Sequence, residues 1–491
     1  MLGLETLPAL VRAAADRFGD HPAYVEGATT LSYADLLDRV ERTAGAYAAS
    51  GVVRGDKVVI WGPNSIDWAV AALAVTYAGG VLVPANSRYV GAEVAELAQR
   101  TRARLIVVDQ GFLGRDQLRE LMEARLDTSI TDVAQLDHFT AFAAGTEPMG
   151  PADLAPDDVA DILFTSGTTG KSKGAMSAHR QTIGVARAWA ELGGVREDDR
   201  YLVVNPFFHS FGYKIGIVVG LLTGCTLFPV ATFDVDQTMR LIETERITVF
   251  PGAPTLYQSL LTAPGRAERD LSSLRLAVTG AAVVPVVLIE RMREELGIDQ
   301  VVTAFGMTEA VVVTMCREGD SAETVATTCG RAIPGMETRI ADNGELLVKG
   351  DYVMLGYLDD EAATAEAIDA DGWLHTGDIG TLDEAGNLRI TDRLKDMYIS
   401  GGFNVYPAEV EQVLMRMDGI SDVAVVGVPD ERMGEVGKAY VVGSVSPDEV
   451  VAYAKEKLAN FKVPRQVEVV DGLPRNLSGK VLKTELRSSG G

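Results

Sequence analysis

Residues 164–175, FTSGTTGKSKGA, combine hydroxyl side chains and glycines with the lysines Lys171 and Lys173. Glycine lets backbone N–H groups approach an anion, hydroxyls add hydrogen-bond donors, and a lysine adds a point charge. The segment follows a strand-like apolar run at 159–164. It is not a Walker A loop, because Thr165 rather than glycine stands five positions before Gly170. The composition predicts a loop that grips phosphate oxygens after a strand, and a flexible linker is the structural alternative.

Two carboxylates follow turn signals further along the chain. In residues 303–310, TAFGMTEA, a glycine turn precedes Thr308 and Glu309. A hydroxyl and a carboxylate beside bound phosphates suit Mg²⁺, which takes oxygen ligands, although Glu309 could instead begin a helix. In residues 373–380, WLHTGDIG, Asp378 follows a Thr-Gly turn and can accept both hydroxyls of a ribose or cap the local backbone.

Three further segments have residue types that suit ligand binding. Gly280, Ala281 and Ala282 follow an apolar run, where small residues let a flat ring lie against the backbone or permit close packing. Residues 391–402, TDRLKDMYISGG, are charged, as exposed linkers between domains commonly are. Residues 474–483, PRNLSGKVLK, place Lys480 after Ser-Gly on a loop that could swing.

Composition narrows the class of protein. The 491 residues exceed the ~250–300 at which one core usually stops growing, so at least two domains are expected. A net charge of −24 argues against nucleic acid or anionic lipid as the main partner. The 3 cysteines form no CxxC and the histidines have no metal-ligand spacing, so we expect a reducing compartment and an oxygen-ligated metal. No cleavable leader is predicted, and we expect a cytoplasmic protein.

Apolar periodicity alternates between helix and strand. Helices are predicted at 34–46 and 68–78, each followed by a strand, at 57–61 and 81–84. The alternation recurs with helices predicted at 239–244 and 286–296 and strands at 249–251 and 274–279. The uncharged stretches 68–85 and 215–233 are long enough to resemble membrane spans, but glycines and prolines interrupt them. We therefore predict a buried helix, turn and strand in each, with no integral membrane segment.

The pattern changes in the last third of the chain. Short alternating strands at 344–349 and 386–391 predict a β-rich subdomain over about 335–392. Beyond it, a helix opened by Pro407, a second helix at 450–458 and strands at 423–428 and 467–470 predict a small α/β unit. The expected fold class is α/β, with a large N-terminal domain of layered α/β subdomains (1–392) and a small C-terminal domain (393–491).

Taken together, these segments resemble the adenylate-forming superfamily of acyl-CoA synthetases, adenylation domains and beetle luciferase over essentially the whole chain. The most specific parts are FTSGTTGKSKGA, AFGMTEA, HTGDIG, DRLKDMYISGGFNVYPAEVE and PRNLSGK. The resemblance implies an ATP-dependent, AMP-forming acid–CoA ligase that uses ATP, Mg²⁺ and coenzyme A. It also implies a mobile C-terminal domain that rotates about a hinge at Lys395.

The resemblance carries roles to individual residues. ATP phosphates are assigned to Thr165, Ser166, Gly167, Thr168, Thr169, Gly170 and Lys173. Phosphate and Mg²⁺ are assigned to Thr308, Glu309 and Thr165, the adenine to Gly280, Ala281 and Ala282, and the ribose to Asp378 and Arg393. Lys480 is implied as the lysine of the first half-reaction, and Gly401 and Gly402 as the loop beside the thiol tunnel. The acyl site is implied at His209, Phe208, Phe211, Gly306 and Met307.

Three residues depart from the pattern of the superfamily. Ser172 stands where proline is usual, which predicts a looser phosphate loop with Lys173 still in register. Phe305 replaces the usual tyrosine, and Tyr398 occupies a position that is generally aliphatic. The effect of Tyr398 on packing around the hinge stays open at this point.

The apolar acyl segments, 207–212, 250–256 and 307–314, favour a medium or bulky hydrophobic acid over acetate. The chain also resembles the actinobacterial relatives that activate the propanoate side chain of degraded steroid rings. Medium- or long-chain fatty acids, and a free-standing acyl-AMP ligase that loads a carrier protein, remain the alternatives. We expect the protein to be a monomer or a homodimer. Acetylation of Lys480 by a lysine acetyltransferase would remove the charge of this side chain and inactivate the enzyme.

Overall fold

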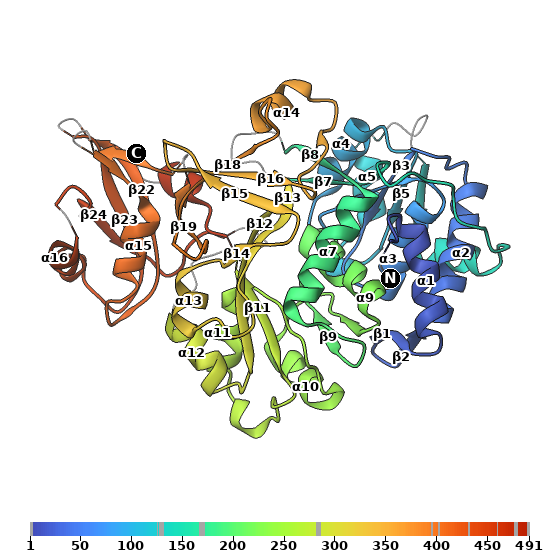
Figure 1. Cartoon of the computed structure of the whole chain (residues 1–491), viewed down its shortest axis with the longest axis horizontal. Coiled ribbons are helices and arrows are strands. Elements are labelled where there is room, and N and C mark those ends of the chain that lie inside the picture. The colour runs from blue at the N-terminus through green and yellow to red at the C-terminus, as the bar shows by residue number, and fades with distance from the viewer. Residues whose placement is uncertain are drawn as a thin grey trace.

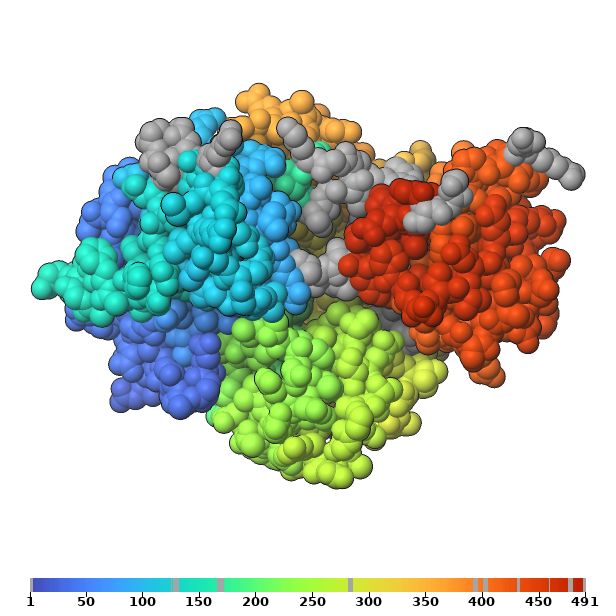
Figure 2. Space-filling model, turned by 180° about the vertical axis from the view of Figure 1, so that it is seen from behind, coloured from blue at the N-terminus to red at the C-terminus, as the bar shows by residue number. Residues whose placement is uncertain are grey.

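The computed structural model describes residues 3–124, 126, 132–165, 172–280, 286–393, 396–400, 403–430, 433–458, 460–475 and 480–488. Layered α/β structure occupies most of the chain, and a smaller α/β unit lies at one end of the molecule (Figure 1). The view from behind shows the same orange-to-red unit beside the larger body (Figure 2). The predicted fold class is confirmed, while the predicted boundary between residues 392 and 393 stays a prediction.

The largest sheet has seven strands in the order β17-β8-β7-β4-β3-β5-β6. Strands β7, β4, β3, β5 and β6 run parallel, and β8 turns back antiparallel to β7. Parallel strands are covered on both faces, which explains why β3, β4 and β5 are almost wholly apolar and buried. The strands are Gly356–Tyr357, Gly174–Ala178, Val159–Phe164, Val81–Ala85, Lys57–Trp61, Leu105–Val108 and Asp132–Gln135, in sheet order.

Helices cover this sheet. Helix α3 (Ile66–Tyr77) begins where the Ser65 side chain accepts a hydrogen bond from Trp68 N–H, and all its residues except Asp67 are buried. Gly79, with a φ of +89°, turns the chain from α3 into β4. The other helices that flank the large sheet or follow it are α1 (Leu7–Phe18), α2 (Tyr33–Ala49), α4 (Gly91–Thr101), α5 (Gln117–Glu123), α6 (Leu136–Ala144), α7 (His179–Gly193) and α14 (Glu361–Ala367).

The second uncharged stretch also folds as predicted. A π-helical segment η2 (Tyr213–Val218) continues into α9 (Val219–Thr223), Gly224 turns the chain at a φ of +82°, and β10 (Thr226–Pro229) follows. Both stretches are therefore a buried helix, a glycine turn and a strand. Within the described ranges, no helix combines the length and the apolar character that a membrane crossing requires.

Two four-stranded sheets lie beside the large one. Their orders are β2-β1-β10-β9 and β11-β12-β13-β14, and Val249 forms single bridges to Tyr201 in one and Leu276 in the other. The predicted strand at 249–251 is thus too long, because only Val249 forms strand bridges, although Phe250 N–H and Gly252 N–H also donate to the carbonyl oxygens of Leu276 and Val278. The further strands are β1 (Pro22–Glu26), β2 (Thr29–Ser32), β9 (Arg200–Val203), β11 (Leu276–Gly280), β12 (Gln300–Met307), β13 (Ala310–Met315) and β14 (Arg331–Ala332), and the helices are α10 (Val235–Glu245), α11 (Pro254–Thr262), α12 (Val286–Glu294) and α13 (Ala322–Thr327).

The β-rich region is an antiparallel sheet in the order β15-β16-β18-β19. Its strands are Met336–Ile340, Glu345–Gly350, Leu374–Leu382 and Leu388–Arg393. The C-terminal sheet pairs β21-β20-β23-β22, with β24 parallel to β23. It comprises β20 (Tyr398–Ser400), β21 (Phe403–Val405), β22 (Ile420–Asp430), β23 (Gly434–Gly443) and β24 (Gln466–Val469), and it packs with α15 (Pro407–Leu414), α16 (Pro447–Lys457) and α17 (Lys483–Ser488). This unit has hydrophobic clusters of its own, one on each face of the sheet.

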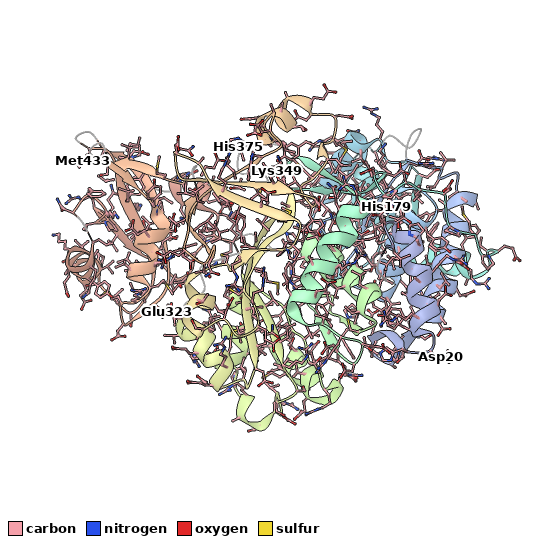
Figure 3. The ribbon with its side chains drawn as sticks, viewed as in Figure 1. Asp20, His179, Glu323, Lys349, His375 and Met433 are labelled. Carbon is pink, nitrogen blue, oxygen red and sulfur yellow. The ribbon has the colours of Figure 1, made fainter. Side chains whose placement is uncertain are left out.

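A buried histidine ties the start of the chain to α7. His179 is 1% exposed where α7 begins, and its Nδ1 accepts a hydrogen bond from Leu7 N–H at 3.2 Å. Figure 3 labels the position of His179. Burial lowers the pKa of His179 from 6.5 to about 4, although the nearby Asp158 carboxylate opposes this shift. The folded protein therefore keeps the ring neutral over a pH range in which an unfolded chain would protonate it.

This lowered pKa predicts a loss of stability in mild acid. The unfolded chain binds the proton near pH 6.5 and the folded chain only near pH 4. The contribution of neutral His179 to the free energy of unfolding is therefore fully present above pH 6.5 and is lost as the pH falls toward 4. Between pH 6.5 and 5 the loss is about 2 kcal/mol. We expect His179→Asn, whose amide oxygen can still accept from Leu7, to lose less stability over that range in urea titrations. His138→Asn, at an exposed histidine, is the matched control, and equal pH slopes for His179→Asn and wild type would contradict the prediction.

Candidate functional site

The β7–β8 hairpin closes the hydroxyl-rich loop at its base. Thr165 N–H donates to the Lys173 carbonyl oxygen at 2.9 Å, and Lys173 N–H donates to Thr165 Oγ1 at 3.4 Å. These bonds confirm that the loop follows a strand, and they show that Thr165 and Lys173 pair at its base. Ser166, Gly167, Thr168, Thr169 and Gly170 lie outside the described residues, so their contacts with phosphate stay predictions.

Arg100 on α4 holds both sides of this loop. Its Nη2 donates to the Ser172 carbonyl oxygen at 2.7 Å, and its guanidinium lies 4.9 Å from the centre of the Phe164 ring. Phe164 precedes the loop and Ser172 follows it. At the position where proline is usual, the backbone of Ser172 is therefore held by the Arg100 side chain. The sequence reasoning did not identify Arg100.

Glu309 lies in a hairpin turn, which shows that the alternative reading as a helix start is wrong. Thr308 and Glu309 connect β12 to β13, where Met307 and Ala310 face each other. Gly306 is required for this turn, because a Cβ there would lie 1.9 Å from the Val311 carbonyl oxygen. The turn places the Glu309 side chain at 8% exposure, and its carboxylate accepts a hydrogen bond from the Tyr357 hydroxyl at 2.7 Å.

Tyr357 connects Glu309 to the loop lysine. Its ring lies 4.9 Å from the Lys173 ammonium, and its strand β17 pairs with β8 through Ala175. Burial and the Glu309 carboxylate raise the pKa of Tyr357, so the hydroxyl remains protonated and donates. The structure thus brings Thr165, Lys173 and Glu309 together through a tyrosine that the sequence analysis missed, because nothing in MLGYLDD marks its distant partner.

The oxygen ligands fit a magnesium ion that is held mainly by phosphates. Glu309 offers a buried carboxylate, and Thr165 and Thr308 offer hydroxyls. In the ranges that the structure describes, no group of three or more His, Cys, Asp or Glu side chains could hold a metal alone. Mg²⁺ suits such a sparse set, since it binds through one or two carboxylates, substrate phosphates and retained waters.

Asp378 and Arg393 face each other across β18 and β19. Asp378 is 2% exposed, and its N–H donates to Thr376 Oγ1 at 3.0 Å. The predicted Thr-Gly turn is wrong, because Thr376 and Gly377 lie within strand β18, at a bulge opposite β16 that the φ of +69° at Gly377 allows. The two residues assigned to the ribose are therefore neighbours in the backbone ladder, although binding of the sugar stays a prediction.

Gly280 ends β11 against β12. A Cβ at this position would lie 2.7 Å from the Ala304 carbonyl oxygen, so close packing of two strands requires the glycine. Ala281 and Ala282 lie outside the described residues, and the assignment of this segment to the adenine stays a prediction. Phe305, which replaces a tyrosine, lies on β12 opposite Thr314.

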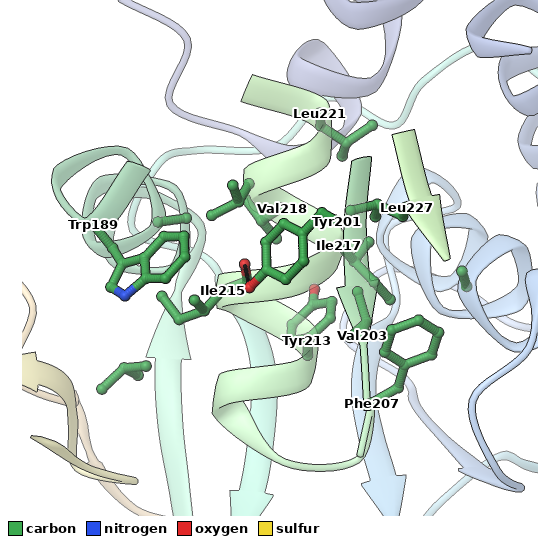
Figure 4. Packing of buried hydrophobic residues seen from close by; sticks show 14 of the residues in the cluster. Trp189, Tyr201, Val203, Phe207, Tyr213, Ile215, Ile217, Val218, Leu221 and Leu227 are labelled. Atoms are coloured by element: carbon green, nitrogen blue, oxygen red, sulfur yellow. Dashed lines mark hydrogen bonds between the residues drawn. The ribbon is translucent and has the colours of Figure 1, made fainter. Parts of the chain in front are cut away.

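The predicted acyl segment is held by a buried amide. Asn64, 4% exposed, donates to the Val203 and Asn205 carbonyl oxygens and accepts from Phe207 N–H at 2.7 Å. Phe207 packs against Trp68 with ring centres 5.3 Å apart, and its place in the core is visible in Figure 4. The role of Asn64 was missed, because its turn-like context does not reveal a backbone contact so far along the chain.

His209 begins the short helix α8 (Ser210–Gly212). Its Nδ1 accepts from Phe211 N–H at 3.2 Å, so the neutral ring carries its proton on Nε2. The residue is exposed, and desolvation by the surrounding protein lowers the pKa of its ring. Phe208, Phe211 and Met307 are each half-buried. This segment presents one N–H donor among apolar groups.

Lys480 belongs to the C-terminal unit. It is half-buried next to Val481, which bridges to Arg475. Lys395, Gly401 and Gly402 lie outside the described residues, so their predicted roles as hinge and tunnel loop are not tested.

Paired glycines make room for Tyr398. A Cβ at Gly427 would lie 2.4 Å from the Tyr398 Cβ, and one at Gly437 would lie 2.3 Å from its hydroxyl oxygen. Gly427 and Gly437 face each other across β22 and β23, so the ring lies over a glycine pair. The bulk that departs from the aliphatic pattern is accommodated within the core of the unit.

Comparison with known proteins agrees with this geometry. Residues 11–358 match the family described as AMP-binding enzyme, and residues 409–480 match the AMP-binding enzyme C-terminal domain. The chain is 54% identical, over 98% of both chains, to the 3-[(3aS,4S,7aS)-7a-methyl-1,5-dioxo-octahydro-1H-inden-4-yl]propanoyl:CoA ligase of Rhodococcus jostii (strain RHA1). It is also 54% identical, over 99% of both chains, to the ligase of the same name from Mycobacterium tuberculosis (strain ATCC 25618 / H37Rv). ATP-bound MatB from Rhodopseudomonas palustris superposes with a TM-score of 0.90, at 30% identity over 99% of each chain.

The Tyr357–Glu309 hydrogen bond predicts a specific effect of Tyr357→Phe. The variant keeps the ring beside Lys173 but removes the donor that orients the Glu309 carboxylate. We expect the Mg²⁺ concentration for half-maximal ATP binding, measured by calorimetry, to rise about tenfold or more, as for other groups that orient metal ligands. Tyr352→Phe, in the same segment, is the matched control. An unchanged Mg²⁺ dependence in Tyr357→Phe would contradict the assignment of Glu309.

Proposed function

The chain belongs to the AMP-binding enzyme family and is an ATP-dependent acyl-CoA ligase, and we propose that its acid is a bicyclic indane propanoate derived from a steroid. The observation that carries this proposal is the 54% identity, over nearly the full length, to two ligases named for that acid. The half-buried phenylalanines around His209 support it, because an apolar wall suits a fused ring system.

The nucleotide binds between the β7–β8 hairpin and the β18–β19 pair. Lys173 and Thr165, with residues 166–170, hold the phosphates, and Asp378 and Arg393 hold the ribose. Glu309 and the hydroxyls of Thr165 and Thr308 hold Mg²⁺, which, when bound, neutralises charge on phosphate oxygens. The buried hydrogen bond from Tyr357 keeps Glu309 oriented for this role.

In the first half-reaction, a carboxylate oxygen of the acid attacks the α-phosphorus of ATP. A P–O bond forms to give the acyl-AMP, and pyrophosphate leaves. Lys173 and Lys480 stabilise the negative charge that accumulates between the two anions. His209 Nε2–H, the outward donor of a neutral ring, hydrogen-bonds an oxygen of the acid and so orients it.

In the second half-reaction, the thiol of coenzyme A attacks the acyl carbonyl, and AMP leaves. Lys480 and the thiol cannot occupy the same small site together. We propose that the unit after residue 393 rotates about Lys395, so that Lys480 withdraws and the loop at Gly401 and Gly402 approaches. The separate hydrophobic clusters of this unit support its movement as one body. The ligase acts in the cytoplasm, where ATP and coenzyme A are supplied.

A panel of acids tests the substrate. We expect kcat/KM for AMP release with coenzyme A to be at least about tenfold higher for the indane propanoate than for hexanoate or long-chain fatty acids, since shape complementarity in an apolar pocket gives discrimination of this order. A fatty acid that matches the indane propanoate would favour the fatty acyl-CoA synthetase alternative. Acyl transfer to a carrier protein in preference to coenzyme A would favour the carrier-loading alternative.

Lys480→Ala separates the two half-reactions. We expect adenylation, followed as pyrophosphate release, to fall by on the order of 10²–10³ because one preorganised positive charge is lost. Thioester formation from synthetic acyl-AMP should be largely unchanged. Lys455→Ala, at an exposed lysine of α16, is the matched control. Equal loss of both steps in Lys480→Ala would refute the assigned role.

A further inference from the structure

A lysine and an aspartate form an ion pair in the interior of the large domain. Lys214 Nζ lies 3.0 Å from Asp161 Oδ1, and the two side chains are 1% and 0% exposed. Lys214 also donates to Ser177 Oγ at 2.8 Å, and Thr182 Oγ1 donates to Asp161 Oδ2 at 2.7 Å. The pair is thus fully enclosed and held on both sides by hydroxyl groups.

The pair joins the two halves of the proposed active site. Asp161 lies on β7 and Ser177 on β8, the two strands that carry the phosphate loop. Lys214 lies in the π-helical segment η2, directly after the segment 207–212 that is proposed to line the acid. Figure 4 shows Tyr213 of η2 and Phe207 within the same packed core. The ion pair therefore joins the hairpin that carries the nucleotide loop to the helical segment that follows the acyl wall.

Stability alone does not account for such a pair. Removing two charges from water costs about as much as their attraction returns, and apolar replacements of buried pairs are often neutral or stabilising. The desolvation cost is evident here, because burial lowers the pKa of Lys214 even though Asp161 opposes the shift. The pair instead fixes how η2 lies against the β7–β8 hairpin, because the two charges neutralise each other in only one relative position of these segments.

Register matters in η2 because a π-helical turn holds an extra residue. If the turn relaxed to an α-helix, in which each residue advances by about 100°, the side chains before it would rotate away from their present positions. Lys214 is in the first turn of η2, where it opposes this relaxation. The residues that would move are those of the acyl wall, Phe208, His209 and Phe211.

We propose that Lys214 and Asp161 are positioning residues for acid recognition, which fix the acyl wall at 207–212 in register with the β7–β8 hairpin. The inference rests on the proposed assignment of 207–212 to the acid. It does not depend on which acid is used, because the test takes the best acid of the panel.

The test uses the neutral double variant Asp161→Asn/Lys214→Met. The amide oxygen can still accept from Thr182 Oγ1, and methionine fills the volume of the lysine stem, so thermal stability should stay near that of the wild type. We expect KM for the acid to rise about tenfold, as for small displacements of binding groups, with KM for ATP changed less than about threefold. Arg115→Met/Glu120→Gln, at a half-buried ion pair away from the acyl wall, is the matched control and should leave both KM values unchanged.

A stable double variant with the KM of the wild type for the acid overturns the proposal. So does an equal rise of both KM values together with a lowered melting temperature, since that is the result of a purely structural role. Thr182→Val, which removes only the hydroxyl that donates to Asp161, decides the matter if the double variant does not fold. A rise of about threefold in KM for the acid alone supports the proposal, and unchanged kinetics refute it.

Discussion

The antiparallel pairing of β7 with β8 is the constraint on which the rest of the site depends. This hairpin carries the loop that we propose binds phosphate, and the bond from Thr165 N–H to the Lys173 carbonyl oxygen closes it. Because β17 adds to the other edge of β8, Tyr357 is brought beside Lys173 and within hydrogen-bond distance of Glu309. The edge of one sheet thus determines where the Lys173 ammonium, the Glu309 carboxylate and the β7–β8 loop lie relative to one another.

Buried polar groups hold the segments around this hairpin. Arg100 fixes the backbone at Ser172, Asn64 fixes the chain before His209, and Asp161 with Lys214 joins the hairpin to η2. Each of these groups satisfies backbone or charged partners that would otherwise be costly to bury. The proposed rotation involves only the C-terminal unit, and these contacts hold the N-terminal segments in the fixed geometry that in-line attack on ATP requires.

Tyr398 illustrates how a departure from a family pattern is accommodated. The phenol ring lies over Gly427 and Gly437, which face each other on neighbouring strands. The Tyr398 side chain on β20 fills the space that side chains at Gly427 and Gly437 would otherwise occupy, so the core can stay closely packed. Likewise, Ser172 lacks the rigidity of proline, but Arg100 on α4 donates a hydrogen bond to the Ser172 carbonyl oxygen and so holds the backbone there.

Local patterns in the sequence were sufficient for the alternation of helix and strand, the β-rich region and the loop after β7, because each depends on neighbours along the chain. They were not sufficient for the hairpin turn at Glu309, the single bridge at Val249 or the bulge before Asp378, where a turn was predicted. Tyr357 and Glu309 are 48 positions apart, and Arg100 and Ser172 are 72 positions apart, so only the strand order could reveal these contacts. The sequence by itself determined the chemistry available to this protein, and the tertiary structure decided which groups meet, since sheet topology joins residues that no local periodicity relates.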